Sequence, residues 1–184
     1  ADRIEAAIVS LPHNLHCSVT LQVVRARRHV LVEKPMAISV KECDQMIEAA
    51  EKTGVILMVG QSRRFIPALR LSKTYLPQIG KPFNMLYLFM TLFSTSNAPA
   101  WWKSAANTGG LVFPMLGSHT MDYSLWLFDD RRPVTVYAKS YSSNPSFEGD
   151  DQGTVIIGMD DGTFITNHLS INTFPAVHDC VING

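Results

Sequence analysis

The chain has 184 residues, of which 46% are hydrophobic and 17% charged, so it can bury one generous core or two small ones. Its 16 basic residues balance its 16 acidic residues, which removes the usual electrostatic case for binding nucleic acid or an anionic membrane. Three well-separated cysteines without CxxC spacing argue against a disulfide framework and a zinc site, and favour a reducing, cytoplasmic compartment.

The first sixty residues alternate short apolar runs with helical patterns. Asn14 is expected to cap a helix that continues to Arg28, and Ser39 with Glu42 forms a capping-box pair before a helix that ends at Gly54. Strands that are apolar on both sides and alternate with helices predict a parallel sheet covered on both faces. Three such strands form part of a doubly wound, Rossmann-type α/β sheet. The apolar runs are AAIVSL (6–11), HVLV (29–32) and VILMVG (55–60).

The pattern changes from about Gln61. We expect a helix from Phe65 toward Gly80, a strand over 81–92, and a helix that Gly109-Gly110 opens and that continues to Trp126. Further strands are expected at 134–142, 154–159, 163–172 and 180–182. The turn Asp160-Asp161-Gly162 between alternating runs predicts a hairpin. The second half is therefore predicted to be an α+β domain with an open, mainly antiparallel sheet.

Two segments of the first half follow predicted strands. LPHNLH (11–16) comes after the first strand, and Glu33-Lys34-Pro35 comes after the second. Ligands of open parallel sheets bind outside the carboxyl ends of the strands, so both segments are expected to face one ligand. Pro35 favours an extended Lys34. A lysine partly desolvated beside a ligand can have a pKa low enough for proton transfer, and an ordinary surface lysine is the alternative.

The segment GGLVFPMLGSHTMD (109–122) places His119 and Asp122 three residues apart, on one face of a predicted helix. A histidine there could act as a general acid or base, although a core histidine with satisfied hydrogen bonds is the alternative. Two such ligands are too few for a metal, so no metal site is predicted.

Taken together, these segments resemble the Gfo/Idh/MocA family of oxidoreductases, named for glucose-fructose oxidoreductase and inositol dehydrogenase. The resemblance is collinear over nearly the whole chain. The similar residues are, in order, Ser10, Pro12 and His16; Glu33, Lys34 and Pro35; Gly60, Arg63, Arg64, Phe65 and Pro67; Trp102, Lys103, Gly109 and Gly110; Gly117, His119 and Asp122; and Asp150-Asp151 followed by TVIIGM and DGTF.

The resemblance implies an enzyme with NAD or NADP as cofactor, which transfers a hydride between nicotinamide and a hydroxyl carbon of a sugar, inositol or similar polyol. It implies that Lys34 and His119 are the catalytic pair. It also implies a homodimer or homotetramer formed through the antiparallel sheet. The implied cofactor-binding residues are Pro12, His13, His16, Glu33, Lys34, Gln61 and Trp102. The implied substrate-binding residues are Lys34, Arg63, Met115 and His119.

Met115 departs from the family pattern, because many family dehydrogenases have an aspartate four residues before the histidine. A methionine cannot accept a proton or orient a hydroxyl group. We therefore expect weak polyol dehydrogenase activity, which Met115→Asp should raise. The alternative is a catalytically weak or inactive, nucleotide-sensing regulator on the same fold; Met115 favours it, and Lys34 and His119 oppose it.

We divide the chain into residues 1–61, the C-terminal part of a dinucleotide-binding Rossmann domain, and 62–184, a substrate and oligomerisation domain that is incomplete at its C-terminus. The family's GxGxxG loop has no counterpart here. Since backbone N–H groups of that loop bind the pyrophosphate, this chain alone is expected to bind dinucleotide poorly and to be inactive. Both ends are expected to be cut.

Overall fold

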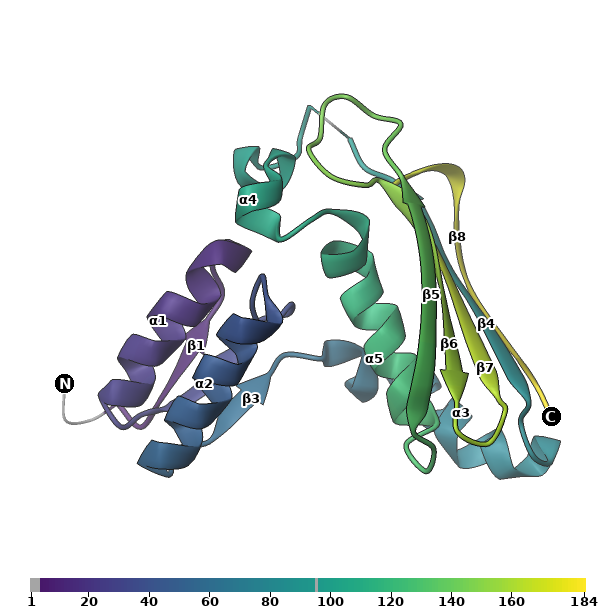
Figure 1. Ribbon diagram of the computed structural model, residues 1–184, viewed down its shortest axis with the longest axis horizontal. Coiled ribbons are helices and arrows are strands. Elements are labelled where there is room, and N and C mark those ends of the chain that lie inside the picture. Colours follow the sequence, from purple (N-terminus) through teal and green to yellow (C-terminus); the bar gives the residue numbers. More distant parts are fainter. Residues whose placement is uncertain (1–3, 95) are drawn as a thin grey trace.

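The computed structural model describes residues 4–94 and 96–184 (Figure 1). Strands β1, β2 and β3 form a parallel sheet, and a second sheet has the strand order β5-β6-β7-β4-β8. In the second sheet β4 and β7 are parallel, and the other neighbouring strands are antiparallel. The predicted fold class is confirmed.

The elements are, in chain order, β1 (Ala6–Val9), α1 (His13–Arg25), β2 (His29–Val32), α2 (Val40–Thr53), β3 (Leu57–Val59), the 3-10 turn η1 (Ser62–Phe65), α3 (Pro67–Tyr75), the 3-10 turn η2 (Leu76–Ile79), β4 (Asn84–Leu92), the 3-10 turn η3 (Ala100–Lys103), α4 (Ala105–Thr108), the π-helical turn η4 (Phe113–Gly117), α5 (Ser118–Leu127), β5 (Pro133–Tyr141), β6 (Gln152–Met159), β7 (Phe164–Ser170) and β8 (Asn172–Asn183).

The first sheet is covered by α1 and α2 on one face. The predicted caps of α2 are confirmed: the Ser39 hydroxyl accepts a hydrogen bond from the Glu42 backbone N–H at 3.3 Å, and Gly54 ends the helix with φ +70°. The covered face and the two helices bury one hydrophobic cluster. Its buried members are Val9, Cys17, Val24, Val30, Val32 and Met46.

The expectation of helices on both faces is wrong for the part of the chain that the structure describes. Ile8, Leu31 and Met58 lie side by side across the three strands on the opposite face, where Ile8 is 73% exposed and Met58 46% exposed. The sheet order β1-β2-β3 advances in one direction, and right-handed crossovers in one direction place both connecting helices on the same side.

Predicted helix boundaries are also wrong at both ends of α1, in the segment after Phe65 and at Gly109. Helix α1 begins directly after Pro12, whose carbonyl accepts from Leu15 N–H, so Asn14 lies inside the helix; the helix ends at Arg25 instead of Arg28. The helix expected from Phe65 is split into η1, α3 and η2, with prolines in the first turn of α3 and of η2.

The glycine pair at 109–110 closes a helix where it was expected to open one. Gly109 is the left-handed C-cap of α4, with φ +77°, and the next helical residues belong to the π-turn η4, which leads into α5. This arrangement brings Gly109 against Ile38, in the loop that follows β2: a Cβ on Gly109 would lie 3.0 Å from Ile38 Cβ. Gly109 therefore lies at a close contact between the two halves of the chain.

We expect Gly109→Ala to destabilise the protein by about 2–4 kcal/mol, because the new methyl group adds a steric clash to the cost of a left-handed alanine. Gly54→Ala is the matched control, since Gly54 has φ +70° but no atom within 4 Å of the place that a methyl group would take. The control should lose only the conformational part, about 1–2 kcal/mol. Urea unfolding of both variants measures the difference, and equal losses would show that Ile38 moves aside without cost.

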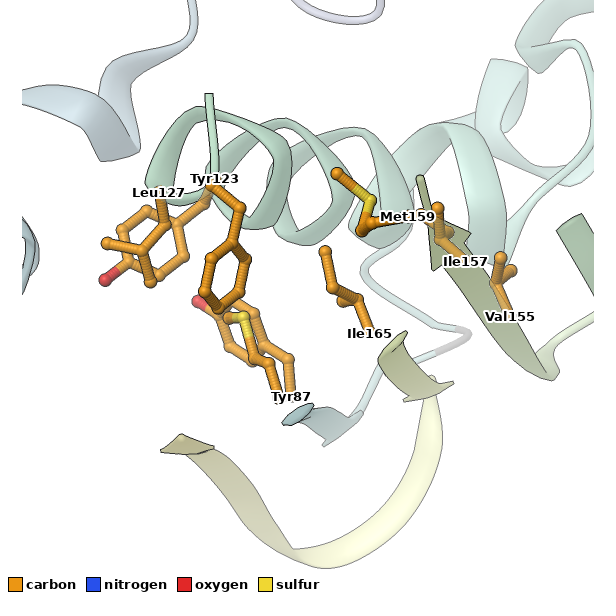
Figure 2. Close-up of a cluster of buried hydrophobic side chains, with 9 residues drawn as sticks. Tyr87, Tyr123, Leu127, Val155, Ile157, Met159 and Ile165 are labelled. Carbon is orange, nitrogen blue, oxygen red and sulfur yellow. The ribbon is translucent and has the colours of Figure 1, made fainter. Parts of the chain in front are cut away.

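The second sheet packs its inner face on α5. Figure 2 shows side chains from the helix and from the strands pointing toward one another between the two layers. Tyr87 and Tyr123 meet edge to face, with ring centroids 5.8 Å apart. The cluster fixes α5, and with it His119, against the sheet. Its buried members are Met85, Tyr87, Tyr123, Leu127, Phe128, Val155, Ile157, Met159 and Ile165.

Candidate functional site

Lys34 links the two halves of the chain. It follows β2, and its Nζ donates a hydrogen bond to the backbone carbonyl of Met115 in η4 at 3.0 Å. Burial lowers the pKa of the Lys34 ammonium group, and Arg63 lowers it further against the opposing effect of Glu33. The structure therefore places a lysine with an enlarged neutral fraction at the start of the helix that carries His119.

His119 lies on α5 close to this lysine. Its Nδ1 is buried and has no hydrogen-bond partner among the described residues. Burial lowers the pKa of His119 to about 3, and the positive charges of Lys34 and Arg63, together with His178, contribute to the shift. The imidazole is therefore neutral at neutral pH, and Nε2, which makes no hydrogen bond to the described residues, is the ring nitrogen left for a ligand.

Arg63 lies in η1 and contacts the inner face of the second sheet. Its Nη1 lies 2.9 Å from His178 Nε2 and donates to the Tyr87 hydroxyl at 3.5 Å, and its Cζ lies 4.6 Å from the centre of the Phe89 ring. The His178 ring stacks on Phe89, with centroids 4.5 Å apart. Lys34, Arg63 and His178 are all close enough to His119 to affect its pKa, so the predicted site residues Lys34, Arg63 and His119 lie in one region of the structure.

The sequence did not predict that His178, Tyr87 and Phe89 lie beside Arg63. His178 lies on β8, opposite Phe89 of β4 in the strand register, and the Tyr87 hydroxyl lies 2.9 Å from His178 Nε2. Pairing between β4 and β8 joins residues about ninety positions apart and leaves no local signal. A weak signal was available in Tyr87 and Phe89, whose spacing of two places both rings on one face of a strand.

Met115 contributes its backbone to this region. Its side chain is only 6% exposed and packs in a second hydrophobic cluster, while its carbonyl accepts the hydrogen bond from Lys34. Its surroundings are the buried residues Leu111, Val112, Leu116, Phe147, Leu169 and Ile171. The predicted α-helical placement of Met115 beside His119 is wrong in one respect, since residues 113–117 form a π-turn. A role of the Met115 side chain in substrate binding stays a prediction.

His13 and His16 hold the loops at the carboxyl ends of β1 and β2. Both rings are buried; His13 Nδ1 lies 3.1 Å from the Thr108 carbonyl, and His13 packs edge-on against Trp101. The two ring nitrogens of His16 lie 2.8 Å from the carbonyls of Leu11 and Pro35. Their predicted role in binding the cofactor stays a prediction.

The other predicted cofactor residues are distributed around the same strand ends. Pro12 precedes α1, and the Glu33 carboxylate accepts from Lys34 N–H at 3.2 Å and lies beside Gly60. Gln61 lines a pocket of about 690 Å³ and has a buried Oε1 without a partner among the described residues. Trp102 in η3 stacks on Phe93, with centroids 5.3 Å apart.

Asp122 has a structural partner. Both of its carboxylate oxygens accept hydrogen bonds from Arg64, at 2.8 Å from Nε and 2.5 Å from Nη2, and the Asp122 side chain is 14% exposed. The pair raises the pKa of the Arg64 guanidinium and ties η1 to the middle of α5. Arg63 is adjacent to Arg64, and His119 lies one helical turn before Asp122, so the pair helps to hold the elements that carry Arg63 and His119 together.

We expect Asp122→Asn to destabilise the protein by about 1 kcal/mol, because it removes the charge from a bidentate, partly exposed ion pair. A double-mutant cycle with Arg64→Gln, read by urea unfolding, should give a coupling free energy of similar size. The more exposed pair Lys73–Asp129 is the control, and its coupling should be smaller, about 0–0.5 kcal/mol. Equal coupling in the two pairs would contradict a special role for Arg64–Asp122.

Residues 4–94 and 96–184 offer neither a metal cluster nor a membrane span. No group of three or more histidine, cysteine, aspartate or glutamate side chains in this part of the chain could hold a metal ion. No helix there is long and apolar enough to cross a membrane.

Family models match both halves of the chain. Residues 1–61 match the model of an oxidoreductase family with an NAD-binding Rossmann fold, and residues 78–184 match the Gfo/Idh/MocA C-terminal domain. The chain belongs to the Gfo/Idh/MocA family.

Several relatives of this Gfo/Idh/MocA chain have named activities. A 1,5-anhydro-D-fructose reductase of Ensifer adhaerens is 28% identical, over 83% of the chain and 46% of the reductase. A scyllo-inositol 2-dehydrogenase (NADP(+)) of Bacillus subtilis is 27% identical, over 94% of the chain and 53% of the dehydrogenase. The crystal structure of GenD2 from gentamicin A biosynthesis, in complex with NAD, superposes with a TM-score of 0.91 at 25% identity, over 100% of the chain and 53% of GenD2. The chain thus spans about half the length of these relatives.

Proposed function

We propose that the whole protein is an NAD- or NADP-dependent oxidoreductase that transfers a hydride between nicotinamide and a hydroxyl-bearing carbon of a sugar, inositol or similar polyol. The observation that carries the proposal is the hydrogen bond from Lys34 Nζ to the Met115 carbonyl, which brings a lysine after β2 to the helix of His119. The relatives named as a reductase and a dehydrogenase support an enzyme over a regulator.

The residues present fit the nicotinamide end of such a cofactor. The carboxyl ends of β1 and β2 are adjacent in the parallel sheet, and Gln61 follows β3, the next strand of the same sheet. The nicotinamide, when bound, accepts or donates the hydride. The residues proposed to hold the cofactor are Pro12, His13, His16, Glu33, Lys34, Gln61 and Trp102; His13 and His16 also contact the loops at these strand ends.

We propose that Lys34 accepts the proton of the substrate hydroxyl group and that His119 holds the same hydroxyl group. Because burial lowers the pKa of Lys34, a larger share of its amine is neutral at a given pH than in an exposed lysine, and this form accepts the proton as the hydroxyl carbon is oxidised. His119 is neutral and can hold the same hydroxyl by a hydrogen bond. Lys34 would take up one proton in each oxidation, and the hydride would pass from the hydroxyl carbon to a bound nicotinamide.

The test incubates the whole protein with NAD or NADP and a panel of sugars and inositols, and follows nicotinamide absorbance. Reduction of the cofactor by at least one member of the panel is the expected result. Tight dinucleotide binding without turnover of any member would favour the regulator.

We also propose that the outer face of the second sheet joins copies of the protein into a homodimer or homotetramer. One register row across this face holds four exposed apolar side chains: Tyr137, Ile156, Leu86 and Val181. Apolar patches of this kind mark interfaces on many proteins. Light scattering should report an oligomer that Leu86→Lys with Ile156→Lys dissociates. A monomeric wild-type protein would contradict this assembly.

The proposal includes the division into residues 1–61 and 62–184, whose boundary falls between β3 and η1. It also includes a cytoplasmic location, with which the three free cysteines Cys17, Cys43 and Cys180 are consistent.

A further inference from the structure

Arg63 is a positive charge without a negative partner. No carboxylate of the described residues lies within 4.0 Å of its guanidinium group, whereas Arg64, Arg131 and Arg132 each pair with an aspartate. Its contacts are the neutral groups of Tyr87 and Phe89 and the ring of His178.

The donor groups of Arg63 are also incompletely used. Its Nε is shielded from solvent and has no hydrogen-bond partner among the described residues, and its hydrogen bonds to those residues all come from Nη1. Buried donors are normally paired, so an unpaired one in a half-buried arginine requires an explanation. The remaining amino group, Nη2, makes no hydrogen bond to the described residues and is the donor left for an oxyanion.

The groups around Arg63 do not supply the missing anion. Lys34 is a second cation, close enough to lower the pKa of His119. The pKa of His178 is lowered mainly by burial and further by the charge of Arg63. Asp122 is bound to Arg64, and Glu33 lies beside Gly60 and the backbone of Lys34. Asp179 is opposite Leu88 in the register and so faces the other side of the sheet from His178.

We propose that the substrate carries an anionic oxygen group, a carboxylate or a phosphate, and that Arg63 binds it, with the exposed ring of His178 beside it. The inference rests on the proposed function, since Lys34 and His119 then hold the hydroxyl that reacts while Arg63 holds the other end of the same molecule. A neutral sugar would leave this half-buried guanidinium without a counter-charge in the bound state, which is less favourable than pairing it with an anion. Arg63 is thus the residue that determines specificity.

The test compares matched ligands on the whole protein: D-glucose, D-glucuronate and D-glucose 6-phosphate, and the same three forms of D-galactose. Isothermal titration calorimetry gives Kd and nicotinamide absorbance gives kcat/KM. In at least one series the acidic form should bind about 10–100 times more tightly than the neutral sugar, the effect of hydrogen bonds to a charged group. The carboxylate and phosphate arms identify which oxyanion the site prefers.

Substitutions of Arg63 test whether the preference for acidic sugars depends on this residue. Arg63→Gln should bring the acidic and neutral forms to within about threefold of each other, and Arg63→Lys should keep part of the preference, since it retains the charge without the planar fork. Arg70→Gln, an exposed arginine on α3, is the matched control and should leave the preference unchanged. Thermal unfolding of each variant verifies that it is folded, and Arg63→Lys serves as the test if Arg63→Gln does not fold.

The inference and the proposed function fail in different ways. Acidic sugars that bind in an Arg63-dependent manner without reducing the cofactor would keep the inference and overturn the function. Turnover of neutral sugars or inositols with no preference for their acidic forms would keep the function and overturn the inference. The inference is also overturned if the acidic preference survives in Arg63→Gln.

Discussion

We expect Lys34→Ala to reduce kcat/KM of the whole protein by about 10²–10⁴-fold, the usual effect of removing a positioned acid or base. The side chain is held by one hydrogen bond, to the Met115 carbonyl, and burial with nearby Arg63 lowers its pKa toward the range in which it can exchange protons. Alanine removes the proton acceptor and also frees the Met115 carbonyl. The measurement is nicotinamide reduction with the best substrate of the panel.

The pH dependence separates a catalytic lysine from a merely structural one. Lys34 accepts a proton only in its neutral form, so kcat/KM for oxidation should rise with pH up to a pKa below the usual lysine value. Lys41→Ala, an exposed lysine on α2, is the control and should keep both the rate and the profile. If Lys34→Ala retains wild-type turnover, the proton goes elsewhere and His119 becomes the first candidate.

The first half of the chain was predictable because the residues that begin and end its helices and strands lie close together in the sequence. Ser39, Glu42 and Gly54 lie within one helix and its caps, and each keeps the role that its side chain or missing side chain predicts. Gly109 shows the limit of such reasoning. A glycine can end one helix or precede the next, and here Gly109 ends α4 at a close approach to Ile38, which is seventy-one positions away in the sequence.

Two residues of the site, Lys34 and His119, were predictable from the sequence. Lys34 follows a predicted strand, and His119 belongs to a short pattern within a predicted helix. His178 could not be placed, because its partners Tyr87 and Phe89 reach it only through the register of β4 with β8. The identity of Met115 was interpreted as the loss of a side-chain function. The π-turn and the burial of its side chain show that what it supplies to Lys34 is a backbone carbonyl, which every residue has.

We expect Met115→Asp to destabilise the fold by about 3–5 kcal/mol, since it buries an unpaired carboxylate among apolar side chains. Met115 is 6% exposed, and its cluster includes Leu116, Phe147 and Leu169. The expectation that this variant raises polyol dehydrogenase activity assumed an α-helical segment with the new carboxylate beside His119. The structure instead directs the side chain of residue 115 into the cluster.

Met115→Leu is the matched control, because it keeps the volume and the apolar surface and should cost less than about 1.5 kcal/mol. Both variants keep the backbone carbonyl that accepts from Lys34, so any difference between them arises from the side chain. Urea unfolding gives the stability, and nicotinamide absorbance on protein verified as folded gives the rate. If Met115→Asp unfolds at the same urea concentration as wild type and turns over polyols faster, then the carboxylate reaches Lys34 or His119, and the loss of a side-chain function at Met115 is the correct interpretation.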